Sequence, residues 1–89
     1  MNEQEFKKYE HSIDSFIHEE ILNLYPNLID YSIHFLPSFL QNDLEFIFRV
    51  KPNMSESQIK NLLHDIYRKM FRCYDNLNLE YKFIIVLVE

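Results

Sequence analysis

The fold depends first on residues 55–76, SESQIKNLLHDIYRKMFRCYDN. Apolar side chains recur there at spacings of three and four from Ile59 to Tyr74, which predicts a long amphipathic helix. Ser55 and Gln58 have the spacing of a capping box, in which each side chain accepts a hydrogen bond from the first turn. The helix is predicted to end in residues 76–78, because asparagine readily adopts the left-handed cap conformation.

Extended segments are predicted on both sides of this helix. In residues 44–50, LEFIFRV, the side chains of Leu44, Phe46, Phe48 and Val50 alternate with the others, and residues 79–88, LEYKFIIVLV, contain a continuous apolar run. The order strand, helix, strand predicts a right-handed crossover that makes these two strands parallel.

Residues 28–36, LIDYSIHFL, also alternate and predict a further strand. One face of this strand carries four apolar side chains, those of Ile29, Tyr31, Ile33 and Phe35. The connection to residues 44–50 is short, so the two strands are predicted to form an antiparallel hairpin. The chain has no glycine, and we expect Asn42 and Asp43 to take the left-handed positions of this connection.

Residues 2–25 have helical periodicity and are predicted to form one amphipathic helix that Pro26 ends. The predicted fold is therefore α+β, a two-layer α-β-β-α-β sandwich with a three-stranded mixed sheet and two amphipathic helices. We expect strand order 2-1-3, with the first strand in the middle and the last at an edge. The 89 residues are expected to form a single globular domain, 1–89.

Composition bears on the cellular setting. The net charge is −5, and acidic residues predominate in residues 1–24. A single cysteine, Cys73, forms no intramolecular disulfide and is expected to be a packing residue. The chain shows no secretory signal and no apolar run of membrane-spanning length. These features predict a cytoplasmic protein that does not enter a membrane.

The absence of glycine excludes the glycine-rich phosphate loop, the dinucleotide fingerprint and the nucleophile elbow. His11, Asp14 and His18 lie on one side of the first predicted helix, but three ligands from one exposed helix make a weak zinc site. No serine or cysteine has an identifiable histidine partner. We therefore predict no catalytic residue, no metal, no cofactor and no enzymatic activity.

The first predicted helix carries an acidic face, formed by Glu10, Asp14 and Glu19. Such a face attracts a basic protein, for example a nuclease-like toxin or another nucleic-acid-handling protein. Phe39 and Leu40 in the hairpin connection are candidate apolar anchors. The predicted function is a small acidic intracellular protein-binding module that neutralises a larger basic partner, by class analogy with toxin immunity proteins and phage-encoded inhibitors.

Two alternatives remain at this point. In the first, the chain is a structural or accessory module that forms a homodimer through its last strand. The second face of the sheet then needs a cover, from a helix of this chain or from another chain, over four apolar side chains, those of Ile47, Ile84, Val86 and Val88.

The other alternative is an RNA-binding module that uses basic residues 68–72 of the second predicted helix. The element order is similar to the type II K-homology domain, whose G-x-x-G loop clamps the RNA backbone. A chain without glycine has no such loop, and nucleic acid is the less favoured partner.

Overall fold

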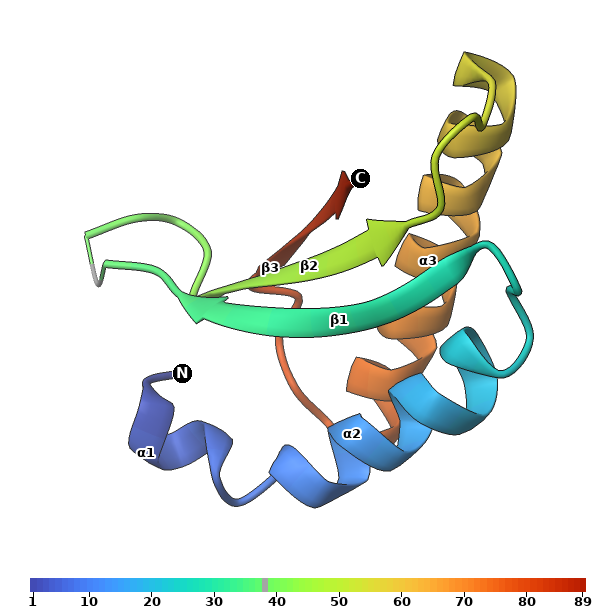
Figure 1. Cartoon of the computed structure of the whole chain (residues 1–89). Helices are drawn as coiled ribbons and strands as arrows, with labels where there is room; N and C mark the ends of the chain where they lie inside the picture. Colours follow the sequence, from blue (N-terminus) through green and yellow to red (C-terminus); the bar gives the residue numbers. More distant parts are fainter. Residues whose placement is uncertain (38) are drawn as a thin grey trace.

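The computed structural model describes residues 1–37 and 39–89. It is an α+β fold in which helices pack against a three-stranded mixed sheet (Figure 1). The elements in chain order are α1 (Glu3–Phe6), α2 (Glu10–Ile17), the π-helical turn η1 (His18–Leu22), β1 (Leu28–Phe35), β2 (Leu44–Val50), α3 (Glu56–Asn76) and β3 (Phe83–Val88).

The sheet order is β1-β2-β3, with β1 antiparallel and β3 parallel to β2. The predicted hairpin and the parallel crossover through α3 are confirmed, as is the edge position of the last strand. The predicted order 2-1-3 is wrong, because β2 and not β1 lies in the middle. The crossover through α3 returns directly to the free side of β2, and β2 carries the most completely buried side chains of the sheet.

The hydrophobic core lies between one face of the sheet and the helices. Leu44, Phe46 and Phe48 of β2 are fully buried, and their register partners on β3 are Phe83, Ile85 and Leu87. The helices contribute further fully buried side chains, those of Ile13, Ile17, Ile21, Ile66, Met70 and Tyr74. Alternation with a period of two in the strands therefore identified the buried face of β2 correctly.

A bulge near the start of β1 changes which residue enters the core. The register runs from Leu28 opposite Val50 directly to Asp30 opposite Arg49, so Ile29 has no partner on β2. Leu28 is buried, whereas Ile29 is 45% exposed. The predicted inward position of Ile29 is wrong, because an extra residue in one strand reverses the alternation before it.

The first helical segment is interrupted rather than continuous. The chain turns at residues 7–9 between α1 and α2, which lets the Phe6 ring meet the edge of the Phe35 ring at 5.5 Å. Farther on, Ile13, Ile17 and Ile21 are all buried at a spacing of four. This spacing drifts around an α-helix of 3.6 residues per turn, and the wider turn of η1 offsets that drift.

The long helix α3 begins as predicted and ends with a left-handed residue. Ser55 Oγ accepts from the Gln58 amide at 3.2 Å, and Gln58 Oε1 accepts from the Ser55 amide at 2.9 Å. Within the described chain, positive φ angles occur at Asn53 and Asn78. The cap predicted in residues 76–78 is thus confirmed, whereas the left-handed positions predicted for Asn42 and Asp43 are wrong.

The last strand is shorter than predicted. It begins at Phe83 rather than at residue 79. The Leu79 amide donates to the Tyr74 carbonyl at 2.9 Å, and the Tyr81 hydroxyl group contacts the Asp75 carboxylate. Residues 79–81 are therefore held at the end of α3, and the chain reaches the sheet at Lys82, whose carbonyl accepts from the Asp43 amide at 2.8 Å.

Candidate functional site

Asp14 is the centre of the predicted acidic face. The Tyr31 hydroxyl group of β1 donates a hydrogen bond to Asp14 Oδ1, and His18 Nε2 lies 3.3 Å from the same oxygen. Burial, this hydrogen bond and the charges of Asp14 and Glu10 all raise the pKa of Tyr31. The negative charges of Glu10 and Asp14 therefore both lie near the Tyr31 hydroxyl group, beside the middle of β1.

An open hollow of about 470 Å³ lies between β1 and the first helical segment. Its wall combines apolar and charged side chains, those of Phe6, Lys7, Glu10, His11, Asp14, Tyr31 and Ile33. The sequence predicted the acidic residues but not their position beside the edge strand β1. Only the packing of α2 against the sheet shows this position.

Glu19 and Glu20 have different surroundings although they are adjacent. Glu19 is exposed, and in the described part of the chain it makes no ion pair. Glu20 lies 3.3 Å from Arg72 and 3.7 Å from Lys69 on α3. The sequence showed basic residues in the second predicted helix and acidic residues in the first, but it did not predict that Glu20 would contact Lys69 and Arg72.

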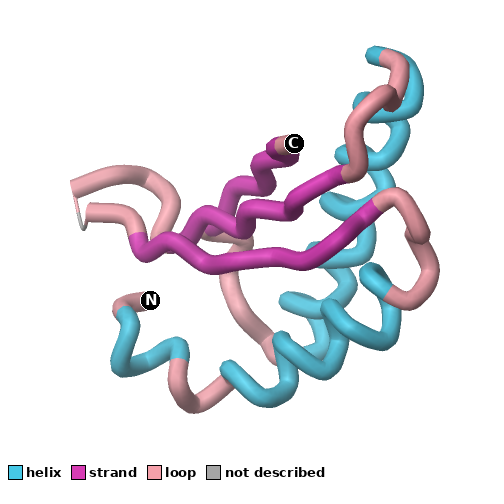
Figure 2. Tube along the Cα trace, in the orientation of Figure 1, coloured by secondary structure: helices cyan, strands magenta, loops and turns pink. Residues whose placement is uncertain are grey.

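Phe39 and Leu40 lie in the connection between β1 and β2. Phe39 is 85% exposed and Leu40 is 46% exposed. This connection projects beyond the sheet, on the side away from α3 (Figure 2). The two candidate anchors are thus accessible and lie at the same end of β1 as α1.

The second face of the sheet carries no buried residue. Ile47, Ile84 and Val86 are half-buried there, and Val88 is 40% exposed. Polar side chains on the same face form cross-strand pairs: Arg49 Nη2 lies 2.7 Å from Asp30, and His34 Nδ1 lies 3.5 Å from Glu45. No helix in the described part of the chain therefore covers this apolar row, which consists of Ile47, Ile84, Val86 and Val88.

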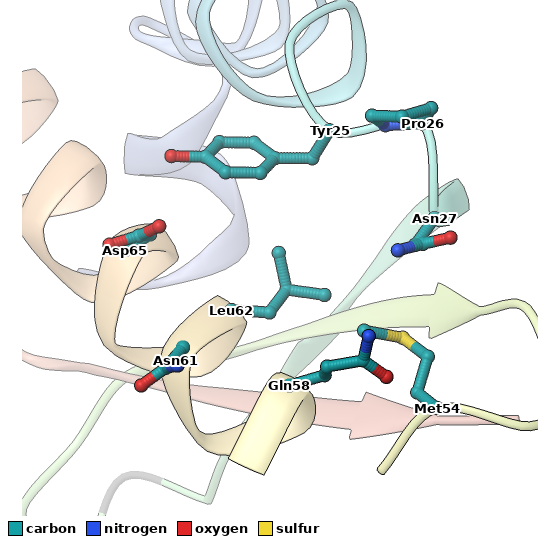
Figure 3. Close-up of a pocket in the computed structure, with 8 residues that line it drawn as sticks. All are labelled: Tyr25, Pro26, Asn27, Met54, Gln58, Asn61, Leu62 and Asp65. Carbon is teal, nitrogen blue, oxygen red and sulfur yellow. The ribbon is translucent and has the colours of Figure 1, made fainter.

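A smaller cleft lies between α3 and the turn that precedes β1. Figure 3 shows Tyr25 and Leu62 on its two sides, with Asp65 beyond the tyrosine ring. Partial burial and the nearby Asp65 carboxylate raise the pKa of Tyr25. The cleft has a volume of about 250 Å³, which is below the roughly 300–1,000 Å³ of ordinary ligand pockets.

The histidines and the cysteine do not come together. Among the described residues, no group of three or more potential metal-ligating side chains is close enough to hold an ion, and no histidine hydrogen-bonds to a serine or cysteine. Cys73 is buried, and its burial raises the pKa of the thiol to about 11. This thiol is a poor nucleophile at neutral pH.

No family model, curated protein or solved structure matches this chain. The described residues include no helix of the length and hydrophobicity needed to cross a membrane. Inferences about function therefore rest on the surfaces described above.

Proposed function

We propose that this chain is a small acidic protein-binding module that captures a larger, basic protein partner. The role is a binding role without catalysis, of the kind played by immunity proteins and phage-encoded inhibitors. A cytoplasmic setting, where a lone thiol stays reduced, belongs to the same proposal.

One observation carries this proposal. In the part of the chain that the structure describes, no lysine or arginine forms an ion pair with Glu10, Asp14 or Glu19. On α3, Lys69 and Arg72 face Glu20, and Arg68 pairs with Asp65 of the same helix. Negative charge therefore remains available on α2 and η1, while the basic surface that an RNA partner needs is partly neutralised.

The exposed connection between β1 and β2 supports the same role. A phenylalanine that is 85% exposed contributes little to the stability of its own fold. Large aromatic side chains that enter a pocket of a partner are typical binding hot spots. We propose that the Phe39 side chain inserts into a pocket of the partner and that Leu40 makes contacts beside it.

Charge reversal tests the proposal. Glu10→Lys with Glu19→Lys should greatly weaken capture of a basic partner from native lysate, with a loss of roughly tenfold in the association rate, and added salt should act in the same direction. Glu80→Lys with Glu89→Lys changes the net charge equally and should leave capture largely intact. Capture that survives both the reversal on α2 and η1 and high salt would refute the proposal.

Self-association is a second candidate function, favoured by the open apolar row of Ile47, Ile84, Val86 and Val88. A second copy would cover this row across a two-fold axis. Light scattering should then give twice the chain mass, and Val86→Lys should give a monomer or an aggregate. A monomeric, well-behaved protein would exclude this function and leave the first one standing.

A further inference from the structure

The two edges of the sheet differ in how their backbone groups are satisfied. On β3, the outward amide of Ile85 donates to the Tyr67 hydroxyl group at 2.9 Å. On β1, the Leu36 amide donates to the Asp43 carbonyl, which fixes the even-numbered residues as those that bond to β2. The backbone groups of Tyr31, Ile33 and Phe35 therefore point away from the sheet.

The β1 edge is open in the described structure. No residue in the ranges 1–37 and 39–89 that lies outside the sheet hydrogen-bonds to the amides of Tyr31, Ile33 or Phe35. An uncovered strand edge of this kind is a template for pairing with another strand. The hollow lined by Glu10 and Asp14 lies directly beside it.

The negative charges of Glu10 and Asp14 beside the β1 edge favour a basic segment as the added strand. Figure 1 shows α2 below β1 and running roughly along it. Glu10 and Asp14 are four residues apart, so their Cβ atoms are separated by about 6 Å on one helix face. Alternate residues of an extended strand lie about 6.7 Å apart on the same side. Lysine or arginine side chains at alternate positions of an added strand match this spacing.

We propose that the β1 edge docks an extended basic segment of a partner protein, which adds as a fourth strand. Its main chain pairs with Tyr31, Ile33 and Phe35, and alternate lysine or arginine side chains extend over the hollow toward Glu10 and Asp14. Lys7 and His11 also line the hollow and restrict the favourable positions to the part nearest these carboxylates. This inference rests on the proposed function and names the mode of recognition.

Ile33 offers a matched pair of variants for the test. Ile33→Ala and Ile33→Pro both shorten the side chain, but only proline removes the outward amide, and it leaves the bonds of the even-numbered residues to β2 in place. The probes are two arginine–threonine peptides of equal composition, one with alternating arginines and one with contiguous arginines. Circular dichroism checks that both variants fold.

We expect the alternating peptide to bind about tenfold more tightly than its isomer. Ile33→Ala should keep this binding, whereas Ile33→Pro and Glu10→Lys should each weaken it by about tenfold. In the unchanged protein, the peptide should slow hydrogen exchange at Tyr31, Ile33 and Phe35. That measurement serves in place of Ile33→Pro if the proline variant does not fold.

Three results would overturn the inference: equal binding of both peptides, equal binding by folded Ile33→Pro and Ile33→Ala, or no binding of either peptide. A doubled mass with the β1 amides protected in the absence of peptide would also overturn it, because a second copy would then be the occupant. Partner capture that depends on Glu10 and Glu19 would survive each of these results. Failure of the docking mode is thus distinguishable from failure of the proposed function.

Discussion

The backbone amide of Ile85 on β3 donates a hydrogen bond to the Tyr67 side chain on α3, at 2.9 Å. The Tyr67 ring also stacks on Phe83, with the ring centres 6.0 Å apart. An edge strand with apolar residues on both faces is prone to pair with other chains. Tyr67 satisfies one of its outward amides and reduces that tendency.

Tyr67→Phe keeps the aromatic stack and removes only the hydroxyl group. We expect a loss of about 1 kcal/mol in the free energy of unfolding, because the Ile85 amide loses its partner, together with increased self-association at high concentration. Urea titration and light scattering measure the two effects. Tyr81→Phe is the control, since its contact with Asp75 is exposed; equal effects of the two changes would contradict the role given to Tyr67.

The bulge in β1 predicts opposite sensitivities for two neighbouring residues. Leu28→Ala should lower the free energy of unfolding by about 2–4 kcal/mol, because it leaves a cavity in the core. Ile29→Ala should change it by no more than about 0.5 kcal/mol, because that side chain lies outside the core and is 45% exposed. Chemical denaturation of both variants is the measurement. The reverse ranking would mean that the strand has regular alternation and no bulge.

Burial of Cys73 should make the free energy of unfolding fall as the pH rises into the alkaline range. Burial raises the pKa of its thiol from 9.0 to about 11, so between these pH values the thiol ionises in the unfolded state but not in the folded state. Stability is then lost as the pH rises, by up to about 3 kcal/mol. Burial also raises the pKa of Tyr74, which adds to the loss above pH 10.

Cys73→Ala isolates the contribution of the thiol. The variant should be less stable than the original protein at pH 7, because a packed side chain is shortened. The difference between the two should shrink by about 2 kcal/mol between pH 8 and pH 11. Urea unfolding across this range measures it. Two curves that stay parallel would show that the thiol has the same pKa in both states.

Glu20 joins the first helical segment to α3 through Lys69 and Arg72. Glu20→Gln should lower the free energy of unfolding by about 0.5–1 kcal/mol at low salt, and the loss should diminish as salt screens the charges. Glu19→Gln is the matched control at the adjacent position, where no cation is paired. A salt-independent loss, or an equal loss in the control, would argue against an electrostatic contribution.

Much of the secondary structure follows from local patterns. The capping box at Ser55 and the left-handed Asn78 depend only on residues within one turn, and the alternation of β2 follows from one buried face. The break between α1 and α2 was not predicted in this way; it accompanies a contact between Phe6 and Phe35, which are far apart in the sequence. Residues 79–82 show the same limitation, since contacts with the end of α3 delay the start of β3.

The candidate site was predictable as a set of residues but not as a surface. Glu10, Asp14, Phe39 and Leu40 were identified from charge, helical spacing and their position in a connection. The open edge of β1 was not predicted; the edge position of β3 was predicted, but the hydrogen bond from its Ile85 amide to Tyr67 was not. The edge strands of a sheet can be predicted only from the correct strand order, and the predicted order placed β1 in the middle.

Local patterns were enough to predict the long helix α3, the hairpin strands, the apolar face of β2 and the acidic character of the first helical segment, because each depends on side chains close together in the chain. Three features followed only from packing in three dimensions: the order of the strands, the bulge that buries Leu28 in place of Ile29, and the hydrogen bond that satisfies an outward amide of β3 while those of β1 stay open. These depend on contacts such as Tyr67 with Ile85 and Tyr31 with Asp14, between residues 18 and 17 positions apart. Packing against a shared core brings such residues together, and local periodicity carries no record of it.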